Sequence, residues 1–184
     1  KNIDSYNIMS LNKYFMNEKE IKEILKKYGK KYKNKKKVLV VCHGSTHKPK
    51  FRNALLLNAR EEVKPNLILD LWSKKYMSYI PENYFDKIIM QYCPLGNPIK
   101  KTNEIMWKNL YRILKKDGFI ENSSILGLYG INVKNKWYTD LSLKQKKITI
   151  DIIDEYFTKK IKFSKIKFKY DKNEKDNKIT LLIK

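Results

Sequence analysis

The hydrophobic pattern of the chain alternates between helical and strand-like periodicity. In residues 18–30 the apolar positions share one stripe of a helix, and Asn17 and Gly29 are placed to cap its two ends. Residues 102–116 and 142–158 carry apolar side chains at the same spacing. The sequence therefore predicts three amphipathic helices.

Apolar runs of strand length lie between these helices. Four of them are residues 38–42, 54–58, 67–72 and 85–92. Several are apolar on both faces, as in a parallel sheet that helices cover. A further strand is predicted from Phe119, after the turn residues Asp117 and Gly118 that should end the preceding helix. The tail alternates strictly in residues 161–170 and 178–184, which is typical of an antiparallel hairpin.

This order of elements predicts an α/β fold with a doubly wound, mostly parallel sheet and a C-terminal antiparallel hairpin. The chain shows no internal repeat and no long linker. We therefore expect an N-terminal helical, basic segment, residues 1–36, and one domain of residues 37–184.

The ends of the predicted strands carry a recognisable succession of motifs. They are KKVLVVCHGS, ALLLNARE, PNLILDLWS, PENYFDKIIMQYCPL and NLYRILKKDGFI. In order and spacing, residues 35–184 resemble the class I (Rossmann-fold) methyltransferases that depend on S-adenosylmethionine. The closing hairpin resembles the sixth and seventh strands of that family, and it is the most specific part of the match. Numbered along the chain, the resemblance implies a sheet of seven strands in the order third, second, first, fourth, fifth, seventh, sixth, with only the strand near residues 178–184 antiparallel.

The resemblance implies an S-adenosylmethionine site at the carboxyl ends of the strands. The residues that it points to are His43, Gly44, Asn58, Asp70, Gln91 and Tyr92. The first loop of the family normally carries several glycines, because its backbone approaches the cofactor closely, whereas this loop has Gly44 alone. Asn58 stands where the family has a carboxylate for the ribose hydroxyls, so charge-assisted strength is lost. Two functions stay open: a methyltransferase, or a catalytically degenerate scaffold of the same fold that works with a protein partner.

The two cysteines, Cys42 and Cys93, each end an apolar run. This favours reduced thiols in an intracellular, cytoplasm-like compartment over a disulfide framework, although a bridge between them stays open. Cys93 is the candidate catalytic residue, since methyltransferases present substrate-facing groups after the fourth strand. Paired with His43, it also suggests a Cys-His hydrolase, a weaker interpretation. Cys42, His43 and His47 lack a second ligand pair, so no metal site is predicted.

The chain is strongly basic, with a net charge of +22 from 41 Lys and Arg against 19 Asp and Glu. Such a charge indicates a nucleic-acid partner, and the candidate contacts are Lys33, Lys35, Lys36 and Lys37 in the densest basic run. Almost all the positive charge is lysine, together with abundant Asn and Ile, as in proteins from AT-rich genomes. Lysine lacks the bidentate geometry of arginine, so we expect sequence-independent attraction. No apolar stretch is long enough to predict a membrane span.

Overall fold

The computed structural model describes residues 14–42, 53–91, 93, 95, 97–122, 141–170 and 178–184. Its strands form one sheet in the order β3-β2-β1-β4-β5-β7-β6. They are β1 (Val38–Val41), β2 (Ala54–Asn58), β3 (Leu67–Ile68), β4 (Phe85–Met90), β5 (Leu114–Asn122), β6 (Lys165–Tyr170) and β7 (Lys178–Ile183). β7 pairs antiparallel with β5 and β6, and the other pairings are parallel. The predicted strand order and the single antiparallel strand are confirmed.

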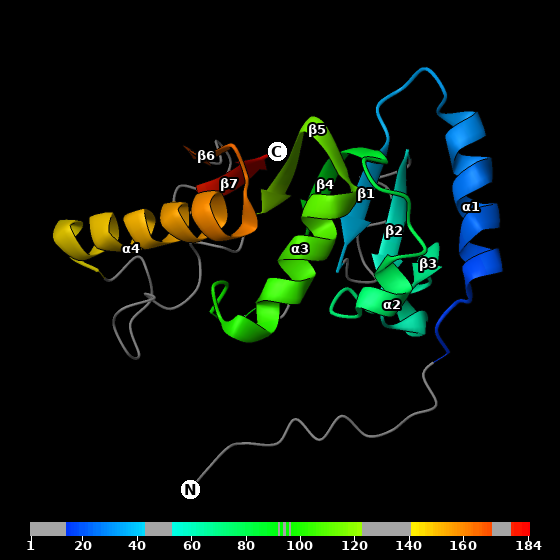
Figure 1. The fold of residues 1–184 in the computed structure, drawn as a ribbon, viewed down its shortest axis with the longest axis horizontal. Coiled ribbons are helices and arrows are strands. Elements are labelled where there is room, and N and C mark those ends of the chain that lie inside the picture. Colours follow the sequence, from blue (N-terminus) through cyan, green and yellow to red (C-terminus); the bar gives the residue numbers. More distant parts are fainter. Residues whose placement is uncertain are drawn as a thin grey trace, which may run out of the picture.

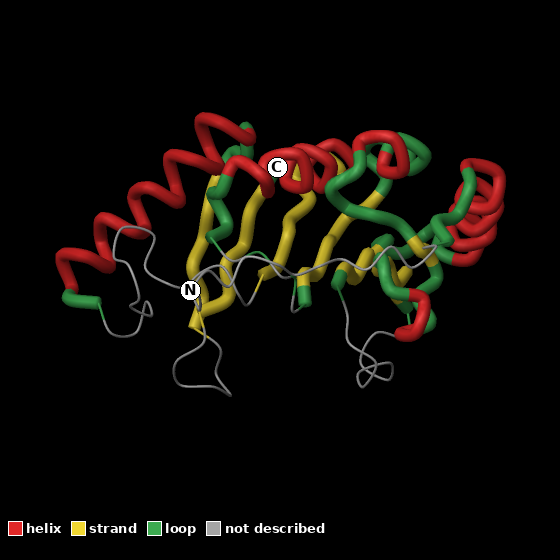
Figure 2. The backbone as a smooth tube through the Cα atoms, turned by 90° about the horizontal axis from the view of Figure 1, so that it is seen from below, coloured by secondary structure: helices red, strands yellow, loops and turns green. Residues whose placement is uncertain are grey.

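Helices pack around this sheet. They are α1 (Glu18–Lys31), α2 (Lys74–Met77), α3 (Glu104–Ile113) and α4 (Leu143–Glu155). α3 and α4 lie on the same side of the sheet, and α1 lies at the end that carries β3 (Figures 1 and 2). A π-helical turn, Tyr156–Ile161, continues α4. No helix in the described part of the chain is long and apolar enough to cross a membrane.

The ends of α1 are set by two different kinds of contact. At its start, Asn17 Oδ1 accepts a hydrogen bond from the Glu20 amide at 3.1 Å, and Glu20 Oε2 accepts one from the Asn17 amide at 2.8 Å. This capping box confirms the predicted start. The predicted end at Gly29 is wrong, because the helix continues to Lys31. Gly29 instead makes room for Tyr84, whose hydroxyl donates to the Leu25 carbonyl at 2.6 Å.

The side chain of Tyr28 fastens α1 to the amino end of β1. Its hydroxyl accepts from the Val38 amide at 2.9 Å and lies within donating distance of the Val38 and Asn53 carbonyls, at 3.0 and 3.2 Å. Burial raises the pKa of Tyr28 to about 12. Because the folded-state pKa lies above the unfolded value, this contribution to stability is complete below about pH 10 and is lost as the pH rises through about 12. Tyr28 thus links α1 to the sheet.

The boundary between α3 and β5 differs from the prediction. The helix ends at Ile113 and the strand begins at Leu114, so Asp117 and Gly118 lie inside β5 and do not form a turn that ends the helix. Lys184 contacts this end of the helix, where its Nζ donates to the carbonyls of Tyr111 and Leu114 at 2.9 and 2.7 Å. A cation that satisfies the last carbonyls of a helix stabilises its C-terminus.

Candidate functional site

The neighbouring strands β1 and β4 mark the place where the order of the strands reverses. From β1 the order runs outward through β2 and β3, and from β4 it runs outward through β5 on the other side. Doubly wound sheets bind ligands in the crevice at the carboxyl ends of such a pair. Cys42 and Gln91 directly follow the two strands, and the Gln91 amide donates to the Val41 carbonyl at 3.0 Å. The fold therefore brings Gln91, a predicted cofactor residue, next to Cys42.

Asn58 and Asp70 stand at the same edge, at the ends of β2 and β3. The Leu69 amide donates to the Asn58 carbonyl at 3.1 Å, which holds the two segments side by side. Asn58 Oδ1 accepts from the Arg60 amide at 3.1 Å, and Asp70 Oδ1 accepts from the Trp72 amide at 3.0 Å. Asp70 Oδ2 accepts no hydrogen bond from the described residues. One carboxylate oxygen at this edge is therefore available to a ligand.

Gln91 carries a second acceptor without a partner. Its side-chain oxygen Oε1 is buried and has no hydrogen-bond partner among the described residues. A buried acceptor without a partner costs about 1 to 3 kcal/mol, so such atoms are uncommon and often mark ligand or water sites. The position of Gln91 directly after β4 places this acceptor at the end of the strand pair described above.

Cys42 and Cys93 form a disulfide, with their Cα atoms 5.0 Å apart. The expectation of two reduced thiols is wrong for this structure. The physical reason is topological: adjacent strands lie about 4.8 Å apart, so residues just beyond the ends of β1 and β4 fall within disulfide reach. In this form Cys93 offers no thiolate. Its predicted role as a catalytic residue, and the Cys-His hydrolase interpretation, would apply only to a dithiol form.

The chain beyond Cys93 is held by side chains that the sequence did not single out. Asn103 is buried, and its Nδ2 donates to the carbonyls of Leu95 and Asn97 at 2.8 and 2.9 Å. Asn103 Oδ1 accepts from Trp72 Nε1 at 3.1 Å, which links the segments that follow β3 and β4. An asparagine before a helix is an ordinary start signal, so nothing in the local sequence indicates these contacts.

Three predicted cofactor residues, His43, Gly44 and Tyr92, lie outside the described residues. Their role stays a prediction.

The predicted lysine contacts lie away from the carboxyl ends of the strands. Lys33, Lys35 and Lys36 are exposed in the connection between α1 and β1, which enters the sheet at the amino end of β1 (Figure 1). Lys37 is half-buried, with its Nζ 4.7 Å from the centre of the Tyr84 ring and its amide donating to Asp86 Oδ2 at 2.8 Å. Cys42 and Gln91 lie at the carboxyl ends of β1 and β4, so this lysine run and the predicted ligand site lie at opposite edges of the sheet.

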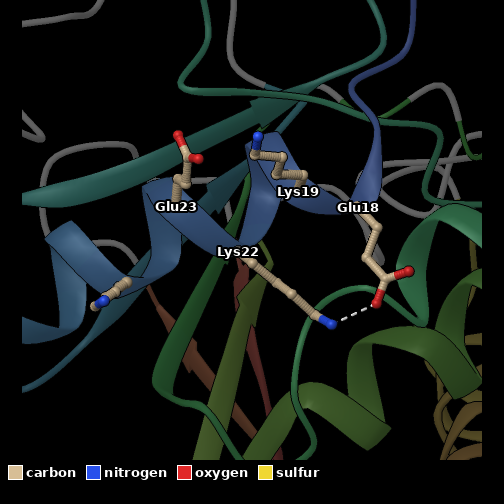
Figure 3. A pocket seen from close by; sticks show the side chains of 5 residues that line it. Glu18, Lys19, Lys22 and Glu23 are labelled. Atoms are coloured by element: carbon tan, nitrogen blue, oxygen red, sulfur yellow. Dashed lines mark ion pairs between the residues drawn. The ribbon is translucent and has the colours of Figure 1, made fainter.

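A shallow hollow on α1 is a weaker candidate (Figure 3). The side chains that line it are Glu18, Lys19, Lys22, Glu23 and Lys26. They belong to one helix, and Lys22 pairs with Glu18 at 2.5 Å, one turn away. Charged pairs at this spacing are usual on a solvated helix face. Within the described residues, no group of three or more His, Cys, Asp or Glu side chains is arranged to hold a metal ion.

Comparison with known proteins shows what this chain is similar to. No protein-family model matches it. A curated relative, "Uncharacterized protein L16" of Acanthamoeba polyphaga mimivirus, is 31% identical over 99 residues, which cover 50% of this chain and 37% of that protein. The match thus spans little more than a third of the relative's length, and that relative's name gives no activity.

Two solved structures resemble nearly the whole chain. The antibiotic-resistance methyltransferase Kmr superposes with a TM-score of 0.55 at 8% identity, covering 92% of this chain and 94% of Kmr. A variant of the 16S rRNA (adenine(1408)-N(1))-methyltransferase from Catenulisporales acidiphilia gives a TM-score of 0.52 at 8% identity, covering 92% and 91%. At such identities the likeness concerns the fold. The chain has the fold of the class I methyltransferases, as its sequence predicted.

Proposed function

We propose that this chain binds S-adenosylmethionine at the carboxyl ends of β1 to β4 and acts as a methyltransferase. One observation carries the proposal: Asn58, Asp70 and Gln91 stand at the carboxyl ends of β2, β3 and β4, at one edge of a sheet with the class I methyltransferase fold. Two of these residues keep a hydrogen-bond acceptor without a partner in the described structure, Asp70 Oδ2 and Gln91 Oε1.

The chemistry of these acceptors suits the cofactor. S-adenosylmethionine carries donors in its ribose hydroxyls, its adenine amino group and its ammonium group, and its sulfonium supplies the methyl group. The side chains of Asn58 and Asp70 would hold donors at the β2–β3 end of the edge, and Gln91 Oε1 would accept one beside β4. The chain would then promote methyl transfer mainly by positioning the cofactor and the substrate for reaction.

The proposed substrate class is a polyanion, RNA or DNA, supported by the net charge of +22. Lys33, Lys35 and Lys36 stand at the opposite edge of the sheet from the crevice. In this proposal they attract the polyanion without orienting the group that is methylated.

Calorimetric titration with S-adenosylmethionine and S-adenosylhomocysteine tests the cofactor site. We expect Asp70→Asn to weaken binding about tenfold, because a hydrogen bond to a charged acceptor is worth about 1.5 to 3 kcal/mol. Asn58→Asp should strengthen binding severalfold by restoring a charged acceptor. Asp154→Asn, which removes an exposed carboxylate of α4, is the matched control and should change nothing. If the unaltered protein binds neither compound, reduced or oxidised, the degenerate scaffold becomes the better interpretation.

Binding to a mixed-sequence RNA, measured between about 50 and 200 mM salt, tests the lysine contacts. Replacing Lys33, Lys35 and Lys36 by Gln should weaken binding and lower the log–log salt slope by about two to three, if each lysine neutralises one phosphate. Lys37 is kept because its Nζ packs on Tyr84.

The matched control for the lysine contacts replaces three other exposed lysines, Lys116, Lys144 and Lys147. Equal losses in the two triple variants would show an evenly spread coat of charge and would contradict a contact at this run.

A further inference from the structure

The Cys42–Cys93 disulfide lies beside the proposed cofactor site. Cys42 follows the last residue of β1, and Cys93 lies just beyond Gln91 at the end of β4. Doubly wound folds bind their ligands outside the carboxyl ends of such a strand pair. With its two Cα atoms 5.0 Å apart, the bridge joins the two segments at the point where they leave the sheet. A ligand at these strand ends would lie against the bridge.

The sheet is held together here without the disulfide. Val41 and Met90 are paired in the ladder, the Gln91 amide donates to the Val41 carbonyl at 3.0 Å, and the Cys42 amide donates to the Leu57 carbonyl at 3.1 Å. Beyond the bridge, Asn103 binds the carbonyls of Leu95 and Asn97. Opening the disulfide should therefore change the strand ends and leave the fold intact.

Two features beside the bridge are energetically unfavourable in the disulfide form. Cys42 has a φ of 58°, in the left-handed region that is unfavourable for a residue with a Cβ. Gln91 Oε1 is buried and has no hydrogen-bond partner among the described residues. If the bridge opened, the backbone at Cys42 could relax and Gln91 could meet a ligand or water.

We propose that the Cys42–Cys93 pair is a redox gate on the cofactor site: the dithiol form binds S-adenosylmethionine, and the disulfide form binds it much more weakly. This inference rests on the proposed function. The reductant is a dithiol. One of its thiolates attacks a sulfur of the bridge, the S–S bond breaks, and two electrons and two protons pass to the cysteine pair. Two cysteine thiols result, and the reductant becomes a disulfide. Cys42 is partly exposed whereas Cys93 is buried, so attack is expected on the sulfur of Cys42.

The gate makes a reciprocal prediction. If reduction raises the affinity for the cofactor by some factor, the cofactor must raise the equilibrium constant for reduction by the same factor. The same coupling can therefore be measured from either side, with two independent techniques.

The direct experiment is calorimetric titration of S-adenosylhomocysteine into the full chain, oxidised and then reduced by excess dithiothreitol. We expect the reduced protein to bind about tenfold or more tightly, within the usual range of coupling between two sites. Cys93→Ser should bind like the reduced protein. The double variant Cys42→Ser/Cys93→Ser is the matched control, and its affinity should be the same with and without dithiothreitol.

The second measurement uses unaltered protein only, so it does not depend on whether the variants fold. The fraction of oxidised pair is followed in dithiothreitol buffers of graded ratio, with and without S-adenosylhomocysteine, and saturating ligand should shift the equilibrium toward dithiol by the calorimetric factor. Equal affinity of the two forms, or tighter binding by the disulfide form, would overturn the gate and leave the proposed function standing. No binding by either form would overturn both.

Discussion

Trp107→Ala is expected to lower the free energy of unfolding by about 3 to 5 kcal/mol, the usual cost of removing a fully buried indole. Trp107 has no exposed surface, and its ring stands edge-on to that of Phe157, with centroids 4.8 Å apart. It joins α3 to the turn that continues α4. Its Nε1 also donates to the Pro98 carbonyl at 2.8 Å, in the segment that follows β4. The substitution leaves a cavity and removes a hydrogen bond at once.

Urea unfolding followed by circular dichroism measures this loss, and Trp107→Phe is the matched control. Phenylalanine keeps an aromatic ring beside Phe157 but cannot donate to the Pro98 carbonyl. We expect it to cost about 1 to 2 kcal/mol, near the net worth of one buried hydrogen bond plus a small loss of volume. Similar, small losses of unfolding free energy in both variants would show that packing of the indole contributes little to the stability of the core.

Much of the fold follows from local patterns in the sequence. The buried runs that became β1, β2 and β4, and the alternating tail that became β6 and β7, carry their periodicity within a few residues. The start of α1 was also predictable, because Asn17 and Glu20 form their capping box three residues apart. Strand order then followed from the resemblance to one family.

The C-terminal ends of α1 and α3 could not be predicted in this way, because residues distant in the sequence lie against them. At the end of α3, the carbonyls of Tyr111 and Leu114 are bound by Lys184, which lies far along the chain. Beside Gly29, where α1 continues, the space that a Cβ would take is occupied by Tyr84. Neither contact leaves a trace in the local sequence.

The same distinction applies to the candidate site. The positions of residues at the carboxyl end of a strand, such as Asn58 and Gln91, were predictable because parallel strands all end at the same edge of the sheet. The disulfide and the contacts of Asn103 depend on which strands are neighbours and on how the chain returns after β4. They became visible only when the segments were placed in space.

Gly118→Ala is expected to destabilise the protein by about 2 to 3 kcal/mol, the usual cost of overpacking a well-filled site. A Cβ at Gly118 would lie 2.9 Å from the carbonyl oxygens of both Asp86 and Lys115. These are backbone atoms at an irregular part of the β4–β5 pairing, where the register shifts between Phe85 and Lys87. The Gly118 carbonyl also accepts from the Lys184 amide at 3.0 Å, so the strand is held from β7 as well. The added methyl group can be accommodated only by moving paired backbone.

Gly29→Ala is the matched control for this prediction, because it makes the same chemical change against a different obstacle. There the Cβ would meet the Tyr84 hydroxyl at 2.9 Å, the far end of a side chain. Moving it weakens one hydrogen bond, to the Leu25 carbonyl, while alanine gains about 1 kcal/mol of helix propensity over glycine. We expect a net change within about 1 kcal/mol for Gly29→Ala. Urea unfolding of the two variants compares them directly. If Gly118→Ala lowers the free energy of unfolding no more than Gly29→Ala does, the backbone of β4 and β5 can move to accommodate the methyl group.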